Sequence, residues 1–549
     1  MTVTHWVVVA ASIVSVVATV HGDGPATTPA AGERLYNGIV LPPVWPPRVE
    51  KLTREPMAPP YLAGPPAVID IDVGRQLFVD DFLIDKTTLT RTFHRAEMHE
   101  TNPVLKPDRP WEASTKSSGH PAPTAMVFSD GVWYDPAEKL FKIWYMGGYV
   151  ASTCYATSPD GLHWTKPELK LKPPTNQVQV GWRDSATVWL DLADSDPARR
   201  FKFFVVGRAT KGWAASVFFS ADGTDWGRPV ALTPPLGDRT TVFYNPFRKV
   251  WVYSIRRDAP GLGRARWYRE HPDAAGGASW RAGEPVPWVG ADRLDPPRDD
   301  LKTAPQLYNL DAVAYESVLL GLFTIWPGQP RDRAKPNYVC LGFSRDGFHW
   351  HRPDRRPFVG VSERCGDWNW GNVQSAGGGC LVVGEKLYFY VSARAGVRGS
   401  AASGVCTTGL AVLRRDGFAS MDAGDEPGEL TTRAVRFTGR RLFVNAEVAG
   451  ELRVEVLGAD GKAIAGLGRD DCLPVRGDKT LQPVAWRGRA DLGKLAGKPV
   501  RFRFHLRKGR LFAFWVSPDA SGASRGFVAA GGPGYAGPTD TVGSAALGT

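Results

Sequence analysis

The stretch Ser158-Pro159-Asp160-Gly161-Leu162-His163-Trp164 occurs in related form three times along this chain. The other two copies run from Ser220 to Trp226 and from Ser344 to Trp350, and a proline follows each Trp three residues later. The Asp residues at 160, 222 and 346 are separated by 62 and then by 124 residues, so the second gap is twice the first. Regular spacing of one motif indicates a fold built from repeated units.

The doubled gap predicts a degenerate copy midway, and Ser279-Trp280 followed by Glu284-Pro285 is the candidate. A further copy without its Trp occurs at 415–418, in the order Arg-Asp-Gly-Phe, which brings the number of units to five. In each turn we expect Gly at positive φ, Asp bonded to nearby backbone N–H groups and Trp packed between sheets. These residues are therefore interpreted as structural rather than catalytic.

Apolar segments precede each turn in pairs, for example Val132–Pro136 and Phe141–Met146. Each unit then has four antiparallel strands, and such a sheet must bury its faces against neighbouring units. Radial stacking of five units predicts an all-β fold, a five-bladed β-propeller. The 60 Gly, 45 Pro and 20 Trp residues fit many short strands and turns. The 43% hydrophobic and 22% charged content excludes wholesale disorder and a coiled coil.

The repeats occupy only part of the chain. From Leu430 the residues alternate between apolar and charged, which predicts a small C-terminal β-sandwich. The expected organisation is a signal peptide at 1–22, a Pro-rich extended lead-in at 23–69, the propeller at 70–425, the sandwich at 430–518 and a disordered Gly/Ala-rich tail at 519–549.

The N-terminus predicts export. Trp6–Val20 is an apolar run with the length of a signal-peptide core, too short for a comfortable membrane span. No later segment is apolar enough to cross a bilayer, so we expect a secreted or periplasmic protein without a transmembrane segment.

The charge distribution and the cysteine content limit which binding partners and metal ions can be expected. The net charge of +11 is spread over the chain, and no basic run is dense enough for nucleic-acid binding. Six cysteines are present without a C-x-x-C pair or zinc spacing, and any disulfide pairing among them stays open. We expect no cofactor; a structural calcium ion in the channel would have no sequence signature. Oligomeric state is not indicated.

Polar residues just before the innermost strands should meet at one end of the channel. Asp184 and Asp238 each lie six residues before an aromatic or apolar strand position, and Asp311 lies four before Tyr315. Carboxylates presented together can act as general acid, base or nucleophile in the cleavage of a glycosidic bond. These three are the first candidates for catalysis.

Glu316 is a fourth catalytic candidate of lower rank, because its place after the inner strand predicts the opposite end of the channel. Trp faces stack on sugars, while amide, carboxyl, guanidinium and imidazole groups bond to hydroxyls. On these grounds the candidate substrate-binding residues are His120, Asp130, Arg239, Asn309, Trp368, Trp370, Asn372 and Gln374.

Five units, S-x-D-G-x-x-W-x-x-P turns and acidic residues at inner-strand starts resemble the five-bladed propeller glycoside hydrolases. This is the arabinanase, levansucrase and invertase superfamily, which includes glycoside hydrolase families 32 and 43. Leu77–Phe82 and Gly237–Thr241 also look like uncharacterised secreted bacterial proteins of this superfamily. The family 32 block W-M-N-D-P-N-G is absent, and Asp238-Arg239 reverses that family's R-D-P order. The resemblance therefore implies the fold, but not fructosidase or arabinosidase specificity.

The predicted function is a secreted glycoside hydrolase acting on a polysaccharide or oligosaccharide. The alternative is a non-catalytic glycan-binding or scaffolding propeller, since a fold does not determine function. A six-bladed sialidase ranks lower, because its Asp-box has one more residue between Asp and Gly. A propeller lyase or phosphorylase would need a metal or phosphate site, for which the sequence has no motif.

Overall fold

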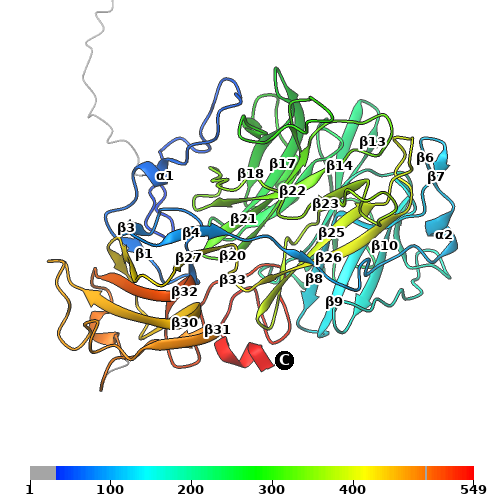
Figure 1. The fold of residues 1–549 in the computed structure, drawn as a ribbon. Helices are drawn as coiled ribbons and strands as arrows, with labels where there is room; N and C mark the ends of the chain where they lie inside the picture. Colours follow the sequence, from blue (N-terminus) through cyan, green and yellow to red (C-terminus); the bar gives the residue numbers. More distant parts are fainter. Residues whose placement is uncertain (1–31, 489–490, 549) are drawn as a thin grey trace, which may run out of the picture.

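The computed structural model describes residues 32–488 and 491–548. Its architecture is a ring of five β-sheets beside a second β-rich region (Figure 1). The first strands of neighbouring blades contact one another around the ring axis, β8 with β12, β12 with β16 and β16 with β20. The predicted five-bladed β-propeller is confirmed. The expected signal peptide lies outside the described residues.

Blades one to three are four-stranded and follow the chain in order. Blade one comprises β8 (Ala125–Asp135), β9 (Leu140–Gly147), β10 (Ser152–Ser158) and β11 (Gln177–Val180). Blade two comprises β12 (Ala186–Leu190), β13 (Phe201–Ala209), β14 (Gly212–Ser220) and β15 (Ala231–Leu232). Blade three comprises β16 (Thr241–Asn245), β17 (Val250–Ala259), β18 (Gly263–His271) and β19 (Val286–Gly290).

Blades four and five recruit strands from distant parts of the chain. Blade four contains β20 (Gln306–Glu316), β21 (Val318–Trp326), β22 (Tyr338–Ser344) and the C-terminal β33 (Phe527–Val528). Blade five contains β23 (Asn372–Ser375), β24 (Leu381–Val383), β25 (Lys386–Arg394), β26 (Cys406–Arg414) and the N-terminal β5 (Glu97–Met98). Because β5 pairs with β26, the ring is closed by a strand that precedes blade one.

The three D-G-x-x-W turns have the expected geometry. Gly161, Gly223 and Gly347 have φ of 76°, 79° and 86°. Asp160 Oδ1 accepts hydrogen bonds from the backbone N–H groups two and three residues later, those of Leu162 (2.8 Å) and His163 (2.9 Å). The 415–418 copy differs, because there Asp416 rather than glycine has positive φ (61°).

Each of these turns also holds a neighbouring blade. The indole Nε1 of Trp144, in blade one, donates to the carbonyl of Gly223 in blade two (2.7 Å). Tyr390 of blade five donates to the carbonyl of Gly161 in blade one (2.7 Å). A Cβ at Gly223 would lie 2.6 Å from the Trp144 ring, so glycine is required for this close approach as well as for its φ.

The second region is one hydrogen-bonded, eight-stranded sheet drawn largely from residues 428–517. The long strands β30 (Arg441–Leu457) and β32 (Arg501–Ser517) carry register shifts between them. The remaining strands are β2 (Gln76–Leu77), β3 (Ile84–Thr87), β4 (Thr90–Phe93), β27 (Ala419–Ala423), β28 (Gly428–Thr432) and β31 (Val475–Pro483). The expected start of the propeller at residue 70 is therefore wrong, because β2 to β4 belong to this sheet and not to a blade.

The short remaining elements lie mainly in the N-terminal and connecting segments: helices α1 (Pro60–Ala63) and α2 (Pro110–Ala113), strands β1 (Ile69–Asp70), β6 (Lys116–Ser117), β7 (His120–Pro121) and β29 (Val435–Arg436), and 3-10 helices η1 (Pro197–Arg199), η2 (Gly276–Ala278), η3 (Gly493–Leu495) and η4 (Gly543–Gly548).

The C-terminal tail is ordered, contrary to the expectation of disorder at 519–549. Its strand β33 pairs with the end of β20, with Val528 opposite Tyr315. In Figure 1 this red segment returns from the second sheet to the propeller. Its Gly/Ala-rich composition suggested disorder, but small side chains are what allow the backbone to approach the blades: a Cβ at Gly526 would meet Gly74 and Glu316 at short distance.

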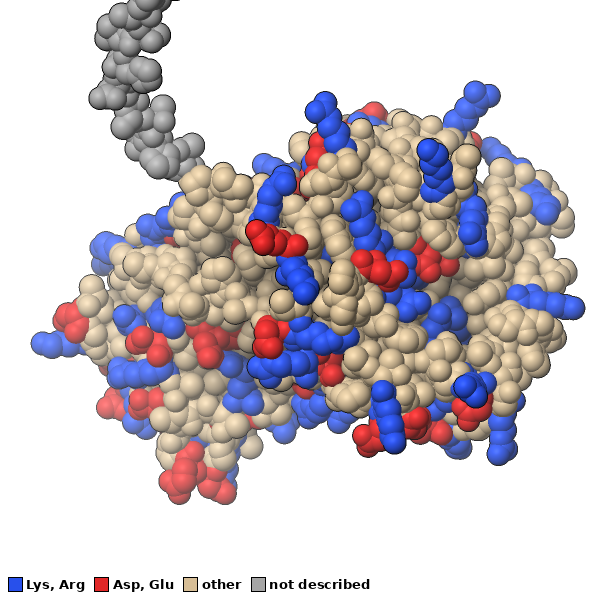
Figure 2. All heavy atoms as spheres, turned by 90° about the horizontal axis from the view of Figure 1, so that it is seen from above, with Lys and Arg blue, Asp and Glu red and all other residues tan. Residues whose placement is uncertain are grey.

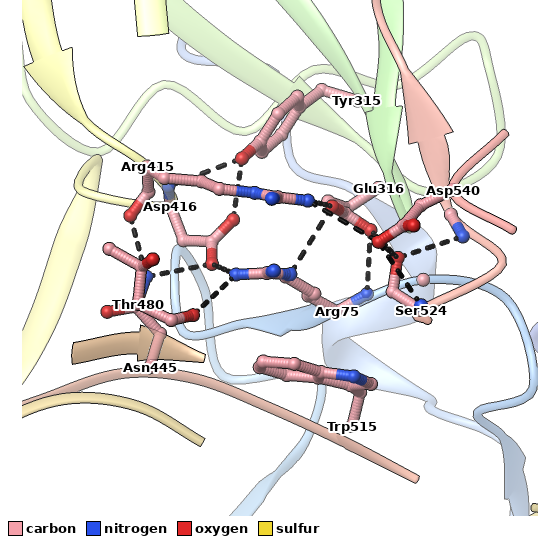
Figure 3. A network of polar contacts seen from close by, with 12 residues as sticks. Arg75, Tyr315, Glu316, Arg415, Asp416, Asn445, Thr480, Trp515, Ser524 and Asp540 are labelled. Carbon is pink, nitrogen blue, oxygen red and sulfur yellow. Dashed lines mark hydrogen bonds and ion pairs between the residues drawn. The ribbon is translucent and has the colours of Figure 1, made fainter. Parts of the chain in front are cut away.

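A buried ionic network joins these parts (Figure 3). Arg75, just before β2, lies 2.8 Å from Asp416 and 3.5 Å from Glu316, and all three side chains have no exposed surface. The guanidinium also stacks over the Trp515 ring of β32, 4.1 Å from its centroid. Arg75 thus links blade four, blade five and the second sheet.

The tail enters the same network. Ser524 Oγ donates to Glu316 Oε2 (2.7 Å), and Arg415 lies 3.2 Å from Glu316 and 3.5 Å from Asp540. On the opposite side, Asn445 of β30 donates to Asp416 (2.9 Å). With their charges buried, these groups depend on one another, since an unpaired buried charge is costly.

Replacement of Arg75 by Met should destabilise the fold by about 3–5 kcal/mol, because Glu316 and Asp416 would lose their shared cation in a buried site. Denaturant unfolding measures the change. Arg34→Met, which breaks a largely exposed pair with Asp70, is the matched control and should change stability by no more than about 1 kcal/mol. Equal effects of the two substitutions would contradict the role assigned to the network.

Candidate active site

Polar side chains converge where the inner strands begin. Asp184 precedes β12, Asp238 precedes β16, and Ser185 Oγ donates to the backbone carbonyl of Asp238 (2.8 Å). The backbone N–H of Asp184 bonds to Val206, near the β13–β14 hairpin. Figure 2, which is seen from above the view of Figure 1, shows that some Lys and Arg side chains lie lower than the surrounding surface.

Ser129 connects blade one to Asp311 of blade four and to Arg239, which precedes blade three. It has φ of 60° and lies in a break of register between Met126 and Gly131 of β8. Its Oγ donates to Asp311 Oδ2 (3.1 Å) and accepts from Arg239 Nη2 (3.0 Å). A left-handed, non-glycine residue in a bulge is strained, and such bulges often redirect side chains beside functional sites.

Asp311 is buried in a cradle of neutral donors. Its Oδ2 accepts hydrogen bonds from Ser375 Oγ (2.6 Å), Asn309 Nδ2 (2.9 Å) and Ser129 Oγ (3.1 Å). Burial raises the pKa of this carboxyl, while the bond from Ser375 and the charge of Arg239 oppose the rise. The protein thus holds this carboxyl through three hydrogen bonds to one oxygen.

Asp130 is paired with Arg183. Both of its oxygens accept from the guanidinium, Oδ2 at 3.0 Å from Nη2, and neither side chain is exposed. This bidentate arrangement neutralises Asp130 and leaves it as a support rather than a group free to contact substrate. Arg183 directly precedes Asp184, so the pair also holds the start of the β12 segment.

Asp184 has the most distinctive environment of the three predicted carboxylates. Burial raises its pKa to about 6, against the attraction of Arg239 and with the added repulsion of Asp238. Its Oδ1 is buried without a hydrogen-bond partner among the described residues. Asp238 is more open, with 31% of its side chain exposed and Arg256 Nε at 3.5 Å.

Arg239 lies near several of these acids, since its charge opposes the rise in the pKa of Asp130, Asp184 and Asp311. Its guanidinium carbon lies 3.8 Å from the centroid of the Phe128 ring and 5.7 Å from that of Tyr308. Tyr308 Oη accepts from Lys335 Nζ (2.8 Å). The charges of Lys335, Arg394 and Arg239 outweigh burial and lower the pKa of Tyr308.

Sequence reasoning missed Arg183, Tyr308, Lys335 and Arg394. A sequence signal did exist for Arg183. An Arg and an Asp are adjacent at matching positions in two units, as Arg183-Asp184 and as Asp238-Arg239. Lys335 lies between β21 and β22, and Arg394 pairs across from Asn372 at the end of β25. No repeat offset marks these last two, because they come from the second strands and loops rather than from the inner strands.

The other candidate binding residues have mixed positions. Asn372 and Gln374 are buried on β23 and bonded to each other (2.7 Å). His120 is exposed on β7. Trp370 is 8% exposed and stacks on Arg333, while Trp368 packs over Gly409 of β26. Arg333, from the segment between β21 and β22, therefore covers part of the Trp370 ring, and Trp368 is only partly buried. The interpretation of the two rings as sugar platforms stays a prediction.

Glu316 does not join the candidate acids. It ends β20, at the opposite end of the strand from Asn309, and its carboxylate belongs to the buried network with Arg75 and Arg415. Its assignment as a catalytic candidate is corrected, because it is fully buried and already paired.

Within residues 32–488 and 491–548, no group of three or more His, Cys, Asp or Glu side chains could hold a metal ion. The six cysteines are unpaired thiols, five of them buried. Among the same residues, none of the helices has the length and apolar character needed to cross a membrane.

No protein-family model and no curated protein sequence matches this chain. Among solved structures, an N-acetylgalactosamine deacetylase from F. plautii, in complex with blood group B trisaccharide, is 14% identical with a TM-score of 0.38. The match covers 61% of this chain and 96% of that one. A thermostable family-43 glycoside hydrolase is 10% identical with a TM-score of 0.38, and the match covers 56% of this chain and 96% of that one.

A fructofuranosidase from Schwanniomyces occidentalis, complexed with fructosylnystose, is 11% identical with a TM-score of 0.34. The match covers 77% of this chain and 98% of that one. At these identities and TM-scores the likeness carries no conclusion about activity.

The raised pKa of Asp184 makes stability depend on pH. A carboxyl with a raised folded-state pKa contributes stability below its unfolded pKa of about 3.9, and that contribution is lost as pH rises through about 6. Asp184→Asn cannot ionise, so its stability relative to wild type should grow from pH 4 to pH 7. Urea unfolding across this range measures the difference, and a pH-independent difference would contradict the assignment.

Proposed function

We propose that this protein is an exported glycoside hydrolase whose active site lies at the channel end formed by Asp184, Asp238 and Asp311. The observation that carries the proposal is the carboxyl of Asp184, whose pKa is raised to about 6 beside a second, more exposed acid. Cleavage of a glycosidic bond usually requires two carboxyls in different environments, because one must be protonated while the other is ionised.

Asp184 supplies the proton. With a pKa of about 6 it is protonated in a useful fraction of molecules near neutral pH, and it gives that proton to the leaving glycosidic oxygen. Asp238, ionised and partly open to solvent, activates water or attacks the anomeric carbon. Asp311 positions Ser129, and through it Arg239, between the two acids.

A non-catalytic glycan-binding propeller is the second candidate. It is favoured by the way Asp130 and Asp311 are satisfied inside the protein, the first by Arg183 and the second by three neutral donors. Acids held in this way can stabilise a channel without taking part in chemistry. Under this alternative Asp184 and Asp238 would contribute hydrogen bonds to a bound sugar only.

Asp184→Asn and Asp238→Asn separate the two candidates. If the protein hydrolyses glycans, each substitution should lower turnover by about 10²–10⁴-fold while leaving glycan affinity largely intact. Reducing-end release from a polysaccharide panel, with calorimetric binding in parallel, measures both quantities. Asp225→Asn, at an exposed position in blade two, is the matched control and should retain full activity.

The pH profile gives an independent check. The rate constant kcat/KM should fall as pH rises through about 6, because Asp184 loses the proton that it must donate. Binding without any reducing-end release, unaffected by either Asn substitution, would favour the glycan-binding alternative instead.

A further inference from the structure

An excess of positive charge surrounds Tyr308 at the channel end. Lys335 Nζ lies 4.7 Å from the centroid of the Tyr308 ring, and the guanidinium carbons of Arg264 and Arg239 lie 5.5 Å and 5.7 Å from it. Arg394 is near enough to lower the pKa of the same phenol. We call Lys335, Arg239, Arg264 and Arg394 the Tyr308 cation group.

No member of this group has a carboxylate within 4 Å in the part of the chain that the structure describes. Their side chains bond instead to neutral oxygens. The acceptors are Tyr308 Oη for Lys335 (2.8 Å), Ser129 Oγ for Arg239 (3.0 Å), Gln306 Oε1 for Arg264 (3.0 Å) and Ser403 Oγ for Arg394 (3.3 Å).

This treatment of cations differs from the rest of the molecule. Two other buried guanidinium groups meet carboxylates directly: Arg345 meets Asp80 at 2.8 Å, and Arg352 meets Asp295 at 2.5 Å. Within the Tyr308 cation group the charges crowd one another. Burial together with the neighbouring Arg239 lowers the pKa of Arg266, just behind it, to about 9. A single anion would relieve this repulsion.

Some N–H donors of this group also lack a hydrogen-bond acceptor among the described residues. Nε and Nη1 of Arg239, and Nε of Arg394, are buried without a hydrogen-bond partner among the described residues. Arg239 and Arg394 are only 1% and 5% exposed, so bulk water does not readily satisfy them. Lys335 is partly exposed and marks the side from which a ligand can approach.

We propose that the Tyr308 cation group is an oxyanion subsite, which binds the carboxylate or sulfate of an acidic sugar unit. The proposal rests on the proposed function for the identity of the ligand as a glycan. Arg and Lys are the side chains that bind such oxygens by charge-assisted hydrogen bonds. Asp184 and Asp238 lie close by and repel a continuous polyanion, so the geometry favours one charged sugar rather than a nucleic-acid backbone.

Lys335 is the position at which to test the subsite, since it is partly exposed and its ammonium group bonds to Tyr308 itself. Binding is measured by calorimetry in the Asp238→Asn background, in which turnover does not interfere. The probes are matched pairs: tetragalacturonate with its methyl ester, and a sulfated carrageenan oligosaccharide with its desulfated form. Inorganic sulfate and phosphate alone form a separate arm.

We expect at least one acidic probe to bind about tenfold more tightly than its neutral partner. Lys335→Met should remove that preference and leave the neutral partner unchanged, while Lys335→Arg should retain it. Lys211→Met, on the exposed β13–β14 hairpin of the same face, is the matched control and should retain it as well. Thermal unfolding of each variant establishes that it is folded.

The arms distinguish the source of the oxyanion. Binding of inorganic phosphate or sulfate alone that Lys335→Met abolishes, without a preference between glycan pairs, would place a free ion in the subsite. Equal binding of acidic and neutral probes, together with no Lys335-dependent binding of either inorganic ion, would overturn the proposal. The test requires no turnover, so hydrolysis of neutral glycans by the wild-type protein would uphold the proposed function even where the subsite fails.

Discussion

The propeller depends on contacts between each D-G turn and the aromatic side chain of a neighbouring blade. A blade of four or five short strands cannot bury both faces alone, so its stability depends on the blades on either side. Trp144 and Tyr390 each donate to a turn glycine of the adjacent blade, and the absent Cβ lets the ring approach. The inner strands contact one another in turn around the axis, and the segments that precede β12 and β16 meet there, where Ser185 donates to Asp238.

Where those strand starts meet, charged and polar groups lie close together and are largely shielded from water. Each group is stabilised in a different way, or is left without a partner. Asp130 is neutralised by Arg183, and Asp311 is stabilised by neutral donors. Asp184 is left with a raised pKa, and the cations around Tyr308 are left without carboxylate partners. Groups left in such unfavourable states are where binding and catalysis are most often found.

A second constraint acts at the opposite end of β20. There Arg75 from the N-terminal segment, Glu316 and Asp416 from the blades, and Ser524 from the tail share one buried network. The chain ends are thereby held against the ring, and β5 and β33 are positioned to join blades five and four. The ring, the second sheet and both ends of the chain therefore share strands and buried charges.

The repeat, the five units and the all-β fold could be read from the sequence because they are local patterns: turn residues at a fixed spacing and alternating apolar strands. Asp184 and Asp238 became candidates for the same reason, since a repeat places equivalent residues at equivalent offsets, and Asp311 lies near the corresponding position of the fourth unit. Only the tertiary structure brought Lys335 and Arg394 to Tyr308, placed Glu316 in an ionic network and ordered the tail. Those outcomes depend on contacts between residues far apart in the chain, and such contacts leave no periodic signal in the sequence.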